Sequence, residues 1–166
     1  MTNDLGGQAA GHLDPGGLVI EGPPSSPGFW LWHATLRWQR AIAAVLAPLG
    51  LTHVQFVLLS CAWWMNDHGL VPNQLELARQ AGTDVKMTSQ VVRKLEAKGL
   101  LERETDPDDT RARRLRVTPN GTGLALAAIE HVERADAAFF QPATSAGLNT
   151  ESLAALLREL TEPDGN

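Results

Sequence analysis

The stretch "PNQLELARQAGTDVKMTSQVVRKLEAKGLLERET", residues 72–105, decides the fold of this chain. Asn73 is suited to cap a short helix that ends at Gly82, and Asp84 is suited to cap a second helix that ends at Gly99. Two short helices separated only by "AGT" make a helix-turn-helix. The second helix also has the apolar stripe that such a unit needs on its inner face, formed by Thr88, Val91, Val92 and Leu95.

The opposite face of that second helix carries side chains that hydrogen-bond well to nucleic acid. An α-helix fits the major groove of duplex DNA, where its outward residues reach base edges and phosphates. Any one of these side chains is common on the solvated face of a helix. The whole set, however, lies in a helix-turn-helix beside a basic segment, and this favours DNA binding. The predicted recognition residues are Lys86, Thr88, Ser89, Gln90 and Arg93.

A hairpin is predicted directly after the second helix. Residues 100–105, "LLERET", and 113–118, "RRLRVT", alternate in character as strands do, and the Pro- and Asp-rich segment between them is suited to a turn. One face of the second strand is apolar. The other face carries Arg114 and Arg116, which can pair across the hairpin with Glu102 and Glu104. The helix-turn-helix therefore continues into a basic wing.

Longer helices are predicted on both sides of this unit. Apolar residues recur at steps of three and four in "FWLWHATLRWQRAIAAVLAPLG" and in the segments 119–141 and 150–161. The fold class is thus mainly α with a small β-hairpin: a winged helix-turn-helix flanked by N- and C-terminal dimerisation helices. The predicted parts are a Gly/Pro-rich arm at 1–28, a domain at 29–161 with its DNA-binding lobe at 52–118 and dimerisation helices at 29–47 and 119–161, and a tail at 162–166.

Composition and charge are compatible with a soluble DNA-binding protein. The 166 residues carry a net charge of −5, but residues 84–118 hold nine of the fourteen Lys and Arg residues against seven of the nineteen acidic residues. Such a locally basic segment can bind phosphates although the whole chain is acidic. The chain has no apolar run that suits a membrane span, no signal-peptide pattern and a single cysteine, so we expect a cytoplasmic location.

Three segments together resemble consecutive blocks of the MarR family, the multiple antibiotic resistance regulators: "LTHVQFVLL", "ELARQAGTDVKMTSQVVRKLEAKGLLER" and "DPDDTRARRLRVTPNG". The resemblance runs from about Phe29 to Leu160. It implies a winged helix-turn-helix, a homodimer joined through its first and last helices, and transcriptional repression that a small aromatic or acidic ligand relieves. It also implies that Asp109 braces Arg111 for entry into a narrow minor groove. The predicted wing contacts are Asp109, Arg111 and Arg113.

A homodimer is also expected from the residues themselves. The first helix, the helix over 119–141 and the final leucine stripe offer more apolar surface than one small winged domain can cover. A two-fold dimer would place its recognition helices about one DNA turn apart, roughly 34–36 Å. We therefore expect double-stranded DNA with a pseudo-palindromic operator as the partner.

All five tryptophans lie between residues 30 and 64, the region that the resemblance places beside the cleft between dimer helices and DNA-binding lobe. One interpretation is an aromatic pocket with cationic groups for an anionic effector. The other is packing in the core or dimer interface, and it fits most of the tryptophans. The predicted pocket residues are Trp30, His33, Arg37, Trp38 and His53.

Two alternatives to a DNA-binding regulator remain open at this stage. The chain could be a protein-binding winged-helix module that never touches DNA, or a redox sensor through Cys61, although a cysteine in the apolar "VLLSCAWWM" is typical of inert packing. An enzyme is not expected, because the sequence has no phosphate loop, dinucleotide fingerprint, HExxH or nucleophile elbow. The five histidines show no HxxxH spacing, so no metal and no cofactor are predicted.

Overall fold

The computed structural model describes residues 12–13, 19–20, 25–105 and 113–161. The chain divides into two compact units, residues 1–39 and 40–166. Two of the predicted wing contacts, Asp109 and Arg111, lie outside the described residues, as does the predicted tail.

The first unit contains a very short hairpin and the start of a long helix. β1 (His12–Leu13) pairs antiparallel with β2 (Val19–Ile20). α1 (Pro27–Leu46) begins here and continues into the second unit. The helix starts slightly before the predicted Phe29, because proline is favoured in a first turn, where its missing N–H has no partner to lose.

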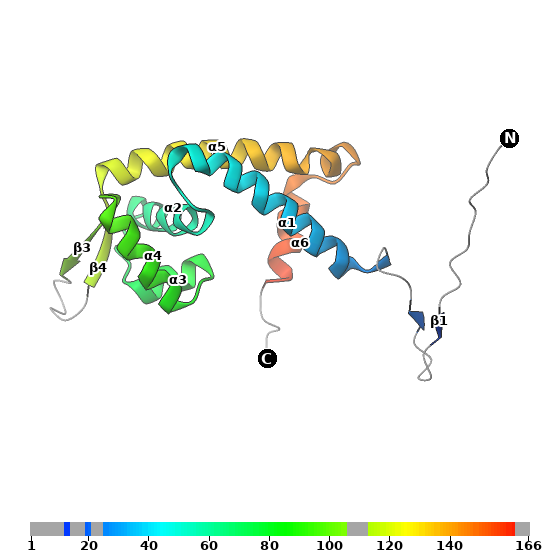
Figure 1. Cartoon of the computed structure of the whole chain (residues 1–166), viewed down its shortest axis with the longest axis horizontal. Helices are drawn as coiled ribbons and strands as arrows, with labels where there is room; N and C mark the ends of the chain where they lie inside the picture. Colours follow the sequence, from blue (N-terminus) through cyan, green and yellow to red (C-terminus); the bar gives the residue numbers. More distant parts are fainter. Residues whose placement is uncertain (1–11, 14–18, 21–24, 106–112, 162–166) are drawn as a thin grey trace. The chain divides into compact units, whose positions relative to one another are not determined.

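The second unit contains the remaining helices and the predicted hairpin. β3 and β4 pair antiparallel with Leu101 opposite Val117 and Thr105 opposite Arg113. The predicted fold class, mainly α with a small hairpin, is confirmed (Figure 1). After α1 the elements are η2 (Ala47–Leu49), α2 (His53–Asp67), α3 (Gln74–Ala81), α4 (Val85–Ala97), β3 (Leu101–Thr105), β4 (Arg113–Val117), α5 (Pro119–Ser145) and α6 (Thr150–Glu159).

The predicted helix caps are confirmed around the helix-turn-helix. The Asn73 side chain accepts from the backbone N–H groups of Leu75 and Glu76, and the Glu76 carboxylate accepts from the N–H of Asn73 at 2.8 Å. The Asp84 carboxylate accepts from Met87 N–H at 2.8 Å and starts α4. Gly82, with φ of 62°, ends α3 in the left-handed conformation that glycine tolerates best. The turn between the two helices is therefore set by local chemistry.

α2 is the central helix of the lobe, since it packs on α3, α4, α5 and β4. Fully buried leucines come from α2, α3, α4 and β4 and form the core beneath the helix-turn-helix and the wing. They include Leu58, Leu59, Leu77, Leu95 and Leu115, each with an exposed fraction of 0%.

Gly121 allows α5 to start directly against the end of the recognition helix. A Cβ at this position would overlap the Leu100 carbonyl oxygen and lie 2.8 Å from Val117 Cγ1. The Thr118 hydroxyl accepts from Gly121 N–H at 3.0 Å and donates to the Gly99 carbonyl at 2.7 Å. The stretch "VTPNG" thus joins the wing, α4 and α5 at one point that only glycine can fill.

α5 is longer than predicted. The sequence favours an end near residue 141, before Pro142, but the helix continues to Ser145. Pro142 lacks the N–H that would bond back along the helix, and its ring crowds the carbonyl four residues earlier, but only three helical residues follow it. The turn after Pro142 is closed by later donors, with Leu148 N–H bonding to the Ala143 carbonyl at 3.1 Å and Gly147 at a φ of 94°.

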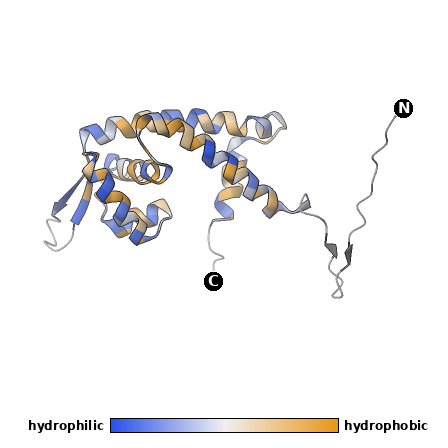
Figure 2. Cartoon of the chain, viewed as in Figure 1, coloured by the Kyte–Doolittle hydropathy of each residue, from blue (hydrophilic) through white to orange (hydrophobic). Residues whose placement is uncertain are grey.

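The outer helices bury little of their surface. α6 has no buried residue, and the buried residues of α1 are only Ile42 and Leu46. Figure 2 shows hydrophobic residues along α6 all the same. No single helix among the described residues is long and apolar enough to cross a membrane; the bent pair α1 and α2 reaches that composition only when the two are taken together.

Candidate nucleic-acid interface

The outer face of α4 presents a continuous set of polar and basic side chains. Lys86, Gln90 and Arg93 are exposed, and Ser89 between them is half-buried. They stand at spacings of three and four, so they share one side of the helix, while Val91, Val92 and Leu95 are buried on the other. The helix therefore has the two faces that the sequence predicts.

Thr88 does not belong to this surface. Its side chain is fully buried, and its hydroxyl donates to the Asp84 carbonyl at 2.8 Å and lies 2.8 Å from the Thr83 hydroxyl. The prediction that Thr88 contacts DNA is wrong, because the same helical spacing that turns Lys86 and Gln90 outward turns this residue into the core. Its role is to stabilise the first turn of α4.

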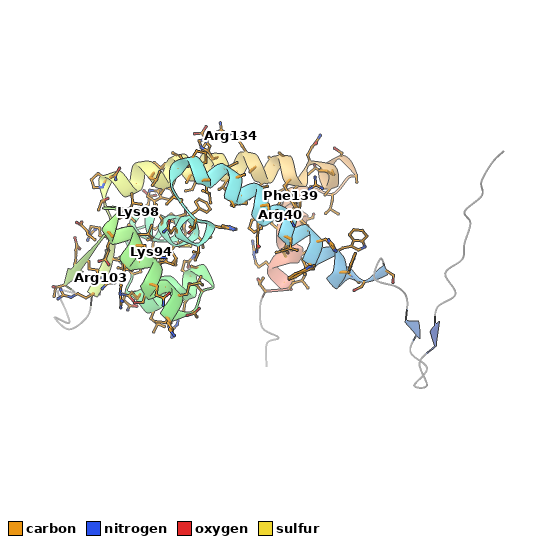
Figure 3. The ribbon with its side chains drawn as sticks, viewed as in Figure 1. Arg40, Lys94, Lys98, Arg103, Arg134 and Phe139 are labelled. Carbon is orange, nitrogen blue, oxygen red and sulfur yellow. The ribbon has the colours of Figure 1, made fainter. Side chains whose placement is uncertain are left out.

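Two exposed residues of α4 were missed by the sequence reasoning. Val85, the first residue of the helix, is 48% exposed, and Lys94 is exposed one turn beyond Gln90. Lys94 is labelled in Figure 3, together with Lys98 and Arg103. The signal for Val85 was present: an apolar residue next to the N-cap that falls outside the inner stripe must face solvent or a ligand.

Ion pairs across the hairpin fix the described part of the wing. Arg116 Nε lies 2.8 Å from Glu104 Oε1, as predicted, and this hydrogen bond raises the pKa of Arg116. Arg103 pairs with Glu96 of α4 at 3.1 Å, so β3 is also tied to the recognition helix. Arg113 donates to the Thr105 hydroxyl at the open end of the hairpin. The acids therefore orient arginines at the described base of the wing.

The predicted pocket residues on α1 are mostly at the surface. Trp30 is 57% exposed and forms a ring cluster with Phe29 and His33, in which the Phe29 and His33 centroids are 4.4 Å apart. Arg37 is exposed and Trp38 is half-buried. None of the five tryptophans is buried within the single chain, so core packing does not account for them. Packing in a dimer interface stays a prediction.

His53, the last predicted pocket residue, and Cys61, the residue of the redox alternative, both lie on α2. Burial lowers the pKa of His53 from its ordinary value, while the nearby carboxylate of Asp136 raises it in part. Burial raises the pKa of the Cys61 thiol. A raised pKa disfavours the thiolate on which cysteine oxidation depends.

Two capped helices in a tight turn, a basic outer face on the second helix and an adjoining hairpin define a winged helix-turn-helix, the DNA-reading unit of many transcriptional regulators. The model of the MarR family matches residues 51–112. Over 141 residues the chain is 44% identical to the uncharacterized HTH-type transcriptional regulator YdcH of Bacillus subtilis (strain 168). The matched region is 85% of this chain and 93% of YdcH. The chain belongs to the MarR family and is a transcriptional regulator.

Solved structures of the family share this fold. BpsR of Bordetella bronchiseptica, whose DNA binding is regulated by 6-hydroxynicotinic acid, is 25% identical, with a TM-score of 0.74 over 87% of this chain and 99% of BpsR. CouR of Rhodococcus jostii RHA1, solved with p-coumaroyl-CoA, is 24% identical, with a TM-score of 0.71 over 85% and 92%. A mutant of Escherichia coli MarR in complex with operator DNA is 20% identical, with a TM-score of 0.67 over 81% and 93%.

Proposed function

We propose that this regulator is a ligand-responsive repressor that binds a pseudo-palindromic operator as a homodimer. The observation that carries the proposal is the outer face of α4, where Lys86, Ser89, Gln90, Arg93 and Lys94 line the side opposite the core. Arg and Lys suit guanine and phosphate, and Gln suits adenine. In the proposal α4 enters the major groove while Arg111 and Arg113, with Asp109 bracing Arg111, reach the neighbouring minor groove.

The dimer in this proposal is supported by surface that the chain leaves uncovered. Leu156 of α6 and Leu160, the C-cap of that helix, are 56% and 68% exposed. Between α5 and α6 lies a groove of about 500 Å³, lined among others by Ala137, Phe140, Leu153 and Leu157. Apolar surface of this extent on a regulator that must span two half-sites fits a helix of a second copy. We assign the groove to that second copy.

The effector in this proposal binds beside the aromatic residues of α1. 6-Hydroxynicotinic acid regulates DNA binding by BpsR, and CouR binds p-coumaroyl-CoA. An anionic ligand of this kind requires cationic neighbours. The groove between α5 and α6 does not offer them, since Glu133 and Asp136 line it. His33 and Arg37 on α1, with Trp30 and Trp38 on the same helix, are the better candidates. Tryptophan fluorescence titrated with phenolic and carboxylic compounds tests this site; no response to a broad panel would contradict it.

The central experiment is selection of bound DNA from a random pool, followed by mobility shifts on the selected sequence at several salt concentrations. We expect an inverted repeat with half-sites about one helical turn apart, and binding that weakens steeply with salt. Arg93→Ala should weaken binding, whereas Glu130→Ala on α5 is a matched control away from α4. Recovery of no sequence, with a folded protein, would favour the protein-binding alternative.

Val85 adds a test of orientation within the groove. An exposed valine at the first position of a recognition helix suits contact with a thymine methyl group. Replacing thymine by deoxyuridine at one symmetric pair of positions should then cost about threefold in affinity for the wild type. The same replacement should cost nothing for Val85→Ala. Equal losses in both proteins at every thymine would show that α4 lies differently in the groove.

A further inference from the structure

α2 makes polar contacts at its two ends with the two elements that face DNA. Near its C-terminal end Asn66 contacts the wing, and near its N-terminal end Gln55 contacts the end of the recognition helix. Neither contact belongs to the apolar core, and the sequence reasoning singled out neither Asn66 nor Lys98. These contacts can set the spacing between the wing and the recognition helix α4.

The Asn66 side chain bonds to both kinds of backbone group on β4. Its Oδ1 accepts from Val117 N–H at 2.7 Å, and its Nδ2 donates to the Leu115 carbonyl at 3.3 Å and to the Leu70 carbonyl at 3.0 Å. An isolated two-stranded hairpin is marginally stable, so its direction depends on what it is attached to. Asn66 supplies such an attachment, because it bridges α2, the loop after it and the strand that leads to Arg113.

A second attachment lies on the same strand. Leu115 N–H donates to the Pro72 carbonyl at 2.8 Å, so β4 lies between β3 and the segment that precedes α3. Pro72 and Leu115 are fully buried. The backbone of β4 is therefore held on one side by its own hairpin and on the other by α2 and the start of α3.

The recognition helix is held at its C-terminal end by Lys98. The ammonium group donates to the Gly50 carbonyl at 2.6 Å and to Gln55 Oε1 at 3.0 Å. Gln55 is only 5% exposed, and the same oxygen accepts from Thr52 N–H in the capping box of α2. A charged donor on a buried, already ordered acceptor makes a well-defined contact. Because α4 is about 20 Å long, a small change at this end tilts the reading end.

We propose that α2 is the frame that fixes the wing relative to the recognition helix, with Asn66 as the positioning residue for the wing and Lys98 as the positioning residue for α4. Neither side chain contacts DNA in this proposal. Each acts through the element it holds, so the two should affect different grooves of the operator. This inference rests on the proposed function, since it assumes binding to an operator.

The experiment compares Asn66→Ala and Lys98→Met on the selected operator by two footprints. Hydroxyl-radical cleavage reports wing protection along the minor groove, and dimethyl sulfate reports guanine N7 in the major groove. Asn66→Ala should weaken binding about tenfold and lose the wing protection while the guanine pattern remains. Lys98→Met should weaken binding by a similar factor, roughly tenfold, and change the guanine pattern while the wing protection remains. Asn120→Ala, an exposed amide at the start of α5, is the matched control and should change neither footprint.

A double substitution tests whether Asn66 acts through the wing or whether Asn66→Ala only destabilises the protein. Arg113→Ala should weaken wild-type binding about threefold, but it should add almost nothing in the Asn66→Ala background. If Asn66→Ala does not fold, Asn66→Asp retains the acceptor for Val117 N–H, removes the two donors, and should give a partial loss of wing protection. Full wing protection in a folded Asn66 variant, or identical footprints for both variants, would overturn the proposal. If the wild type selects no operator, the proposed function itself fails.

Discussion

The recognition helix α4 and the final helix α6 have similar sequence patterns but differ in how much of their surface is buried. Both are capped by an acidic or amide side chain, and both carry an apolar stripe. α4 buries four residues against α2, α3 and β3, whereas α6 buries none. α4 therefore covers its apolar stripe within one chain, whereas α6 leaves its stripe exposed, and in our proposal a second copy covers it. Substitutions in the two regions should differ in whether their effects depend on protein concentration.

The largest effect is expected at the junction that completes the lobe. Gly121→Ala places a methyl group against the carbonyl of buried Leu100 and the side chain of half-buried Val117, and should lower the free energy of unfolding by about 3 kcal/mol. A Cβ at Gly123, two residues further along α5, would meet nothing within 4 Å, so Gly123→Ala should be neutral or stabilising by up to ~1 kcal/mol. Urea unfolding at two protein concentrations measures both. Equal effects of the two substitutions would show that α5 does not approach the end of α4 closely.

The next effect concerns the terminal helix. The double substitution of Leu156→Asp and Leu160→Asp should weaken self-association by roughly 100-fold or more, because it places two carboxylates on the apolar face of α6. Leu75→Asp on α3, at a similarly exposed leucine of the lobe, is the control and should leave self-association unchanged. Sedimentation velocity measures both, and circular dichroism checks that the lobe stays folded. A dimer that survives the double substitution would mean that α6 is not part of its interface.

The two N-caps allow a finer comparison. Asp84→Ala removes the acceptor for Met87 N–H and should cost about 1 kcal/mol of stability at any protein concentration. Asn149→Ala removes the acceptor for Ser152 N–H at the start of α6. It should cost a similar amount, about 1 kcal/mol, but only at concentrations where the protein is associated. Thermal unfolding over a hundredfold range of concentration separates the two, and a cost at Asn149 that is independent of concentration would contradict the comparison.

How much of this could be predicted from sequence differs between the same two regions. The caps at Asn73 and Asp84 and the inner stripe of α4 are local patterns, so the helix-turn-helix and hairpin were predictable. The sequence placed Thr88 both in the inner stripe and among the DNA contacts, because a hydroxyl suits either role, and the burial of its side chain leaves only the first. Asn66 and Lys98 were not predictable, because their partners lie 51 and 48 residues away along the chain. Polar contacts of that range leave no periodic signal.

The smallest effect tests α2 through its first residue, His53. Burial lowers the pKa of His53, so the folded protein holds the imidazole neutral more strongly than the unfolded chain does. A histidine with a lowered folded pKa contributes stability that is complete above its ordinary pKa of about 6.5 and is lost as the pH falls through the folded value. Unfolding measured between neutral and mildly acidic pH should therefore show a decline that His53→Gln reduces. Asp136→Asn should enlarge it, because the carboxylate that raises the pKa is gone. A decline that is identical in wild type and His53→Gln would mean that other groups titrate, and that α2 begins in a more solvated place.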